Sequence, residues 1–193
     1  MVIEALTRVA ELLKPGMDGL IIDAAAEEVI RDYGALPGFK GFNGFPSTLC
    51  ISKNESVVHG IPDDVPFTET DILSIDCGAL FDGYYGDSAY TFALGEVDDA
   101  VMQLLAVTRE SLYRGIAKAV EGNRMGDIGH AVQHFCEREH KYSIVRELVG
   151  HGIGEELHEA PEVPNYGRRG MGSQLKEGLV IAIEPMVNMG RKS

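Results

Sequence analysis

The stretch SIDCGALFDGYYGDSAYTF, residues 74–92, reads as a β-hairpin in which Asp82-Gly83 forms the turn. Two further aspartates, Asp76 and Asp87, lie inside the runs that we expect to be strands. Asp is depleted in strands, and an unpaired buried carboxylate costs free energy. The hairpin therefore carries two acids that ordinary strand packing does not explain.

The turn fixes the expected pairing, which places Gly78 opposite Asp87 and Asp76 opposite Ala89. Because side chains alternate along a strand, the two aspartates share one face of the hairpin as diagonal neighbours, roughly 7–8 Å apart. Carboxylates this close raise each other's pKa unless a positive charge lies between them. A divalent cation bound by both is one explanation. The alternative is that one carboxylate binds backbone amides while the other reaches solvent.

The composition is that of a globular protein: of 193 residues, 45% are hydrophobic and 24% are charged. The formal net charge of −13 argues against nucleic acid or an anionic membrane as a general partner. Three cysteines without metal or redox spacing indicate reduced thiols in a cytoplasmic protein. No run reaches the ~20 apolar residues of a membrane span, and the N-terminus, with Glu4 in a helical pattern, is not a signal peptide.

Helices and short strands alternate along the chain. Periodicity and capping residues predict helices at 2–14, 18–34, 97–120 and 127–139, the last starting at an Asp127 cap. Besides the hairpin, strands are expected around 49–52, 56–62, 143–147 and 179–185.

The sequence contains a faint internal repeat. When its first half is aligned with its second half, Gly16 matches Gly122 and Ile22 matches Ile128. Each half then runs helix, glycine break, helix, strand and acid-bearing strand. This order predicts an α+β fold, a single domain spanning 1–193 with pseudo-equivalent halves at approximately 1–95 and 96–193.

Further candidate metal ligands lie elsewhere in the chain. Glu184 stands in the apolar run VIAIEPM. It lies two residues after position 182, which the internal repeat aligns with Asp76. Three histidines lie beside or near glycines: His151 in GHGIG, His158 soon after it, and His59 in VVHGIP. A lone histidine is more often structural, but three of them in a chain with paired acids favour a site.

The pair His130 and His134 has the spacing of a zinc-binding helix, but Ala131 stands where that pattern needs a glutamate. We therefore expect a polar surface stripe there rather than a metal site.

Five motifs together, VVHGIPDD, IDCGALFDGYYGDSA, VGHGIGEELHEAP, IEPM and the Cys50-Ile-Ser run, resemble the type I methionine aminopeptidases of peptidase family M24. The resemblance covers essentially the entire chain. It implies the pita-bread fold, in which two pseudo-symmetric αα–β halves surround a central antiparallel sheet. Xaa-Pro aminopeptidases and creatinases share that fold, but HGIPDD favours the methionine enzyme.

The resemblance implies roles for individual residues. Asp76, Asp87, His151 and Glu184 would bind two divalent ions (Co, Mn, Fe, Zn or Ni), with Glu184 also assisting the nucleophile. His59 and His158 would contact the substrate as catalytic residues near the scissile amide. The methionine pocket would be built partly by Phe39, Phe42, Phe45, Cys50 and Leu157.

The chemistry of such a site agrees with the rest of the sequence. Paired ions activate water and polarise a carbonyl, so hydrolysis needs no protein nucleophile, and the chain has no Ser-His-Asp or Cys-His signature. The implied substrates are N-terminal methionyl peptides of nascent chains with a small second residue. We expect a cytoplasmic monomer that works in proximity to the ribosome and binds neither nucleic acid nor membrane.

The sequence departs from the family at its end. The family has a fifth ligand, a glutamate on a late strand, whereas the repeat brings Asp87 onto Ser193, the last residue. We expect a chain truncated at its C-terminus and also at its N-terminus, which binds the second ion weakly and has little or no activity. The alternatives are an Xaa-Pro aminopeptidase or creatinase-like metallohydrolase, and a non-catalytic peptide-binding module of the same fold.

Overall fold

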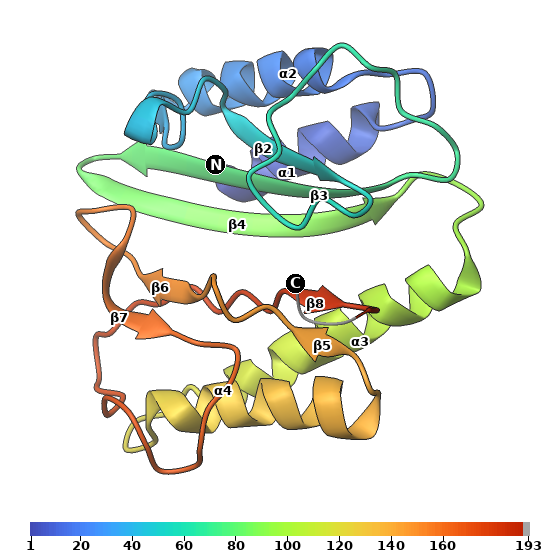
Figure 1. Cartoon of the computed structure of the whole chain (residues 1–193). Coiled ribbons are helices and arrows are strands. Elements are labelled where there is room, and N and C mark those ends of the chain that lie inside the picture. The colour runs from blue at the N-terminus through green and yellow to red at the C-terminus, as the bar shows by residue number, and fades with distance from the viewer. Residues whose placement is uncertain (191–193) are drawn as a thin grey trace. The chain divides into compact units, whose positions relative to one another are not determined.

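The computed structural model describes residues 1–190, which form two compact units (Figure 1). The first comprises Met1–Asp98 together with Glu155–Leu157, and the second comprises Asp99–Gly154 and the chain from His158 onward. Ser193, onto which the repeat brings Asp87, lies outside the described residues. Over residues 1–190, no helix has the combination of length and apolar character that crossing a membrane requires.

The first unit packs two helices on a small antiparallel sheet (Figure 1). Strand β3 pairs with β4 along its whole length on one side, and with β2 and then β1 on the other. The elements are α1 (Val2–Leu12), α2 (Gly19–Asp32), β1 (Leu36–Pro37), a short 3-10 turn η1 (Phe42–Gly44), β2 (Leu49–Lys53), β3 (Ile72–Phe81) and β4 (Tyr84–Ala93).

Strand β3 divides its side chains between two faces. Leu73, Ile75 and Cys77 are completely buried and join the core formed with α1 and α2. The residues between them point to the other face, where Ser74 Oγ lies 2.9 Å from Thr91 Oγ1 across the β3–β4 pair. The burial alternation thus assigns one face to the core and leaves the other for the two aspartates.

The predicted hairpin register is confirmed: Gly78 pairs with Asp87 and Asp76 pairs with Ala89. The predicted cap of the second helix is also confirmed, because the Ile21 amide donates to Asp18 Oδ1 at 3.0 Å.

The second unit repeats the order of helices followed by strands. Its elements are α3 (Asp99–Ile116), α4 (Met125–Gln133), a π-helical turn η2 (His134–Glu139), β5 (Ser143–Ile144), β6 (Gly150–Gly152), β7 (Glu159–Val163) and β8 (Val187–Asn188). Strand β5 pairs with β8, and β6 pairs with β7.

The cap predicted for α4 was wrong, because the helix begins two residues earlier, after Arg124. Asp127 lies in its first turn, where one carboxylate oxygen accepts from the Arg124 amide at 2.8 Å and the other from the Gly170 amide at 2.9 Å. The acid therefore stabilises the helix start from inside the helix and fastens a distant loop to it.

Two predicted strands are absent from the described residues. Residues 56–62 are irregular, because His59 adopts a left-handed backbone (φ +58°) that no strand accommodates. Residues 179–185 make only an isolated bridge, from Ile181 to Gly152. Pro185 has no amide hydrogen with which to extend it.

The internal repeat has a structural counterpart. Gly16 and Gly122 both adopt the left-handed backbone, at φ +88° and +89°. Each precedes a helix, α2 or α4, that buries its equivalent isoleucine, Ile22 or Ile128. Glycine is needed at these breaks because a side chain is strained at positive φ.

Candidate functional site

The first unit brings three of the predicted residues onto one face of its sheet. Asp76 lies in the middle of β3, and Asp87 lies diagonally across from it on β4. Cys50 of β2 pairs with Asp76 from the other side. Burial, with the charges of these two aspartates, raises the pKa of the Cys50 thiol to about 12. The two carboxylates therefore lie close enough to the thiol to disfavour its negatively charged form.

Phe39 covers this face beside the acids. A Cβ added to Gly78 would lie 2.4 Å from Phe39 Cε1, so the ring occupies the space that a side chain at position 78 would need. The Gly38 amide donates to the Gly78 carbonyl at 2.8 Å. This bond holds on β3 the start of the loop between β1 and β2, residues 38–48, which we call the aromatic loop. The glycine opposite Asp87 thus makes room for a predicted pocket residue.

The other predicted pocket residues of this unit lie nearby in the chain or in the fold. Phe42 and Phe45 are half-buried in the loop between β1 and β2. Leu157 is almost completely buried in a segment that belongs to this unit.

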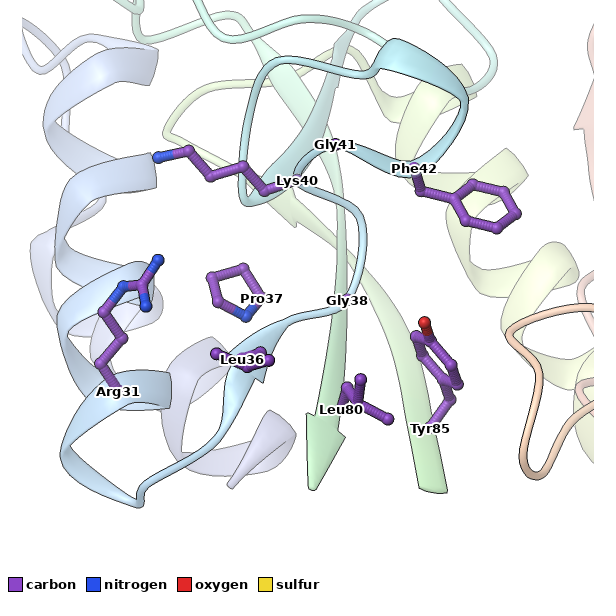
Figure 2. Close-up of a pocket in the computed structure, with 9 residues that line it drawn as sticks. All are labelled: Arg31, Leu36, Pro37, Gly38, Lys40, Gly41, Phe42, Leu80 and Tyr85. Carbon is purple, nitrogen blue, oxygen red and sulfur yellow. The ribbon is translucent and has the colours of Figure 1, made fainter. Parts of the chain in front are cut away.

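A pocket of about 420 Å³ opens at the turn end of the hairpin (Figure 2). Leu80 and Tyr85, which pair across β3 and β4, form part of its wall, and alternation places them on the same face as the two aspartates. Its lining is Arg31, Leu36, Pro37, Gly38, Lys40, Gly41, Phe42, Leu80 and Tyr85.

In the second unit, two glycines let three backbone segments close around His151. A Cβ at Gly150 would lie 2.2 Å from the Ala182 oxygen, and one at Gly152 would lie 2.5 Å from the Ala160 oxygen. The Ala182 amide donates to the His151 carbonyl at 2.7 Å. The Gly-His-Gly sequence is therefore required for the segment leading to Glu184 to run beside β6.

This packing orients the His151 ring toward Glu184. Nδ1 lies 2.9 Å from the Gly152 carbonyl, which only accepts, so Nδ1 carries the ring proton. Nε2 is then the lone-pair nitrogen, and it lies 3.7 Å from Glu184 Oε1. That separation is too long for a hydrogen bond. An imidazole held by a backbone carbonyl, with its other nitrogen facing a carboxylate, fits a divalent cation.

The other two candidate histidines, His59 and His158, are exposed. The His158 ring meets the His151 ring edge-on, with the centroids 4.4 Å apart. His59 lies in the first unit, in the left-handed conformation noted above, and the Gly60 amide after it donates to Ser52 Oγ at 3.0 Å. Such a conformation at a residue other than glycine costs roughly 1–3 kcal/mol and persists only where the surrounding structure holds it.

Sequence reasoning missed Asn165, which is almost completely buried and whose Nδ2 donates to the Glu184 carbonyl at 2.6 Å. It holds the backbone of a predicted metal ligand. In the sequence, Asn165 stands in PNYG, which has the composition of a turn and gives no signal of this contact.

Comparison with known proteins agrees with this geometry. Residues 1–192 match metallopeptidase family M24. The methionine aminopeptidase of Clostridium acetobutylicum is 50% identical over 188 residues, which cover 97% of this chain and 75% of that protein. The chain therefore spans about three quarters of the length of this relative.

Solved structures give the same result. The crystal structure of methionine aminopeptidase from Rickettsia prowazekii matches with a TM-score of 0.96 and 37% identity, over 100% of this chain and 77% of that one. A prolidase from Pyrococcus horikoshii matches with a TM-score of 0.78 at 24% identity, over 94% of this chain and 50% of that one, which shows a shared pita-bread fold and no more. The chain belongs to metallopeptidase family M24, and within that family to the methionine aminopeptidases.

Proposed function

We propose that this protein hydrolyses the peptide bond after an N-terminal methionine, with little activity in the 193-residue chain, and that Asp76, Asp87, His151 and Glu184 are ligands of divalent cations. The observation that carries the proposal is the pair of aspartates on one face of the β3–β4 hairpin, in a chain that is 50% identical to a methionine aminopeptidase. A pair of half-buried carboxylates on the sheet face that points away from the core has no role in the core, whereas hard carboxylate oxygens are suited to binding such ions.

Bound divalent ions would acidify a water molecule and polarise the scissile carbonyl. The protein's own residues have other tasks. The Glu184 carboxylate holds the proton of the attacking water, and its position is set by Asn165 on its backbone. His59 and His158 donate hydrogen bonds near the scissile amide, where negative charge develops. Phe39, Phe42, Phe45, Cys50 and Leu157 surround the methionine side chain, whose flexible thioether suits an aromatic and sulfur-containing wall.

The finer features of the function are also proposals. We propose two ions, of Mn, Fe, Co, Zn or Ni, because a set of carboxylates with one imidazole accommodates each of them. The substrates would be nascent chains with a small second residue, processed by a monomer in the cytoplasm near the ribosome. The net charge of −13 supports binding to a peptide rather than to nucleic acid. Residues 1–193 would act together as one catalytic domain.

The test compares two Asp→Asn variants of the same hairpin. Asp87→Asn removes a proposed ligand, whereas Asp82→Asn changes an exposed turn residue at φ +50°, a conformation that Asn also adopts. We expect D87N to lose Mn²⁺ binding in calorimetry and hydrolysis of a Met-Ala-Ser peptide with Mn²⁺ or Co²⁺ present, and D82N to retain the levels of the unmodified chain. Equal binding and hydrolysis in both variants would refute the proposal.

A Met-Pro-Ser peptide separates the methionine enzyme from an Xaa-Pro enzyme. The proposal predicts that Met-Ala-Ser is cleaved at least as fast as Met-Pro-Ser, because methionine and a small second residue are recognised rather than a proline ring. Preferential cleavage before proline would instead support the Xaa-Pro alternative.

A further inference from the structure

Helix α2 holds the aromatic loop between β1 and β2 through one carboxylate. Glu27 Oε2 accepts from Lys40 Nζ at 2.7 Å and from Thr48 Oγ1 at 3.1 Å. Its other oxygen, Oε1, accepts from Arg31 Nε at 2.8 Å. Lys40 lies near the start of the loop and Thr48 at its end, so a single side chain binds both ends of residues 40–48, which carry Phe42 and Phe45.

A second acid on the same helical face fixes the point where the loop enters β2. Asp23 lies one turn before Glu27, and its Oδ1 accepts from the Leu49 amide at 2.7 Å. Burial raises the pKa of Asp23, while hydrogen bonds from the Leu49 and Thr48 amides oppose this shift. The exit of the loop is thus anchored through its backbone, whereas Lys40, near the start, is held through its side chain.

The middle of the loop is a tight turn with backbone hydrogen bonds of its own. The Gly41 amide donates to the Phe45 carbonyl at 2.7 Å, and the Phe42 amide donates to the Phe39 carbonyl at 3.0 Å. Bonds of this kind hold the shape of a turn, whereas contacts to other elements hold its place in the fold. The position of Phe42 therefore depends on the contacts that hold the turn as a whole.

Figure 2 shows that Lys40 extends back toward α2, whereas the Phe42 ring points away from that helix. Only Gly41 separates the two residues in the sequence. Arg31 and Lys40 line the helix side of the pocket, and Phe42 and Tyr85 lie on its other side. Fixing Lys40 on Glu27 consequently fixes the backbone from which Phe42 projects.

We propose that Glu27 is a positioning residue for substrate selection, which holds the aromatic loop through Lys40 and Thr48 so that the loop accepts a methionine side chain. This inference rests on the proposed function, because it assigns the loop to the methionine pocket. The Glu27 side chain is only 20% exposed, whereas its partners Lys40 and Arg31 are 43% and 51% exposed, so the carboxylate is the more sheltered side of these contacts.

The experiment uses Glu27→Gln and Lys40→Met, which remove one charge from each side of the contact at nearly constant volume. Glu28→Gln is the matched control, because Glu28 is the next residue of α2 and is exposed. We measure hydrogen exchange in peptides covering residues 38–48, and kcat and KM for Met-Ala-Ser and Leu-Ala-Ser. Circular dichroism melts check that each variant is folded.

In E27Q and K40M we expect faster exchange of the loop and a KM for Met-Ala-Ser raised by about tenfold, with kcat changed less, because the loss of one charge-assisted contact is of this order. The preference for methionine over leucine should fall by a similar factor. The double variant should resemble either single variant, because both changes remove one contact. E28Q should behave like the unmodified chain.

Unchanged loop exchange in both variants would overturn the inference, and so would faster exchange with an unchanged preference for methionine. If the unmodified chain cleaves neither peptide, the proposed function fails, and the inference is then tested by the affinities for methioninamide and leucinamide. An unmodified chain that binds methioninamide more tightly, with this preference lost in E27Q and K40M, supports it. A preference retained in those variants, or absent from the unmodified chain, overturns it.

Discussion

Replacing Gly78 with alanine should destabilise the first unit by forcing Phe39 out of place. The added Cβ would lie 2.4, 2.7 and 3.0 Å from three ring carbons of Phe39, well inside van der Waals contact. Phe39 is only 8% exposed, so its ring has little room to retreat. Gly86 of β4 provides the control, because a Cβ there meets only Val2 Cγ2, at 3.4 Å.

The expected magnitude follows from two opposing terms. Overpacking of a buried site costs typically about 1–3 kcal/mol. Exchanging glycine for alanine within a strand recovers roughly 0.5–1 kcal/mol through backbone entropy. The difference is about 0–2.5 kcal/mol, and because two of the ring contacts, at 2.4 and 2.7 Å, are shorter than real Cβ contacts, we expect Gly78→Ala to lie in its upper part, at about 1–2.5 kcal/mol. This is a fall in Tm of roughly 2–10 °C for a chain of this size. Gly86→Ala should be neutral or slightly stabilising.

Urea denaturation followed by circular dichroism measures the difference, because the midpoint falls while the slope is unchanged when only stability is altered. Adding Phe39→Leu to each background completes a double-mutant cycle. The smaller side chain should cost less in the Gly78→Ala protein than in the unmodified one, with a coupling of about 1 kcal/mol. Equal stability of Gly78→Ala and Gly86→Ala, or no coupling to Phe39, would refute the packing argument.

Three further predictions concern single groups. Asp18→Ala should cost about 1 kcal/mol of stability in denaturant melts, because the Ile21 amide loses its acceptor, whereas Asp18→Asn should cost far less. All three cysteines are buried, and the pKa of Cys50 is raised to about 12, so a thiol reagent at pH 8 should find no reactive thiol in the native protein and three after unfolding. Lys40 and the other donors lower the pKa of Glu27 from 4.5 to about 2. Because the folded-state pKa is the lower one, the stabilisation is complete above about pH 5 and is lost as pH falls from 4.5 toward 2, so melts over this range should show a shallower acid limb in Glu27→Gln.

The hairpin could be read from the sequence because its register is set locally. Asp82-Gly83 specifies a tight turn, and alternation then places Asp76 and Asp87 on one face without reference to the rest of the fold. The same holds for the Asp18 cap, where donor and acceptor are three residues apart. At the hairpin and at the Asp18 cap, the predictions therefore succeeded because they depend only on residues that are close in sequence.

The two failed strand predictions concern segments whose conformation is decided by distant partners. The 179–185 run alternates like a strand, but its partner β6 is only three residues long, and the contact reduces to one bridge at Ile181. Nothing in the sequence near His59 shows that it adopts positive φ, because that conformation follows from the docking of Gly60 on β2. The hold of Glu27 on Lys40 joins residues 13 positions apart through a loop without periodicity.

The division of β3 into two faces has a consequence for how the strand finds its alignment. If β3 slipped by one residue against a neighbouring strand, its two faces would be exchanged. Asp76 would then lie in the hydrophobic core beneath the helices, and Ile75 and Cys77 would leave that core. Such a misaligned ribbon would lose apolar burial and trap a carboxylate at the same time. The acids that we propose as metal ligands thereby also disfavour a misaligned pairing of the strands.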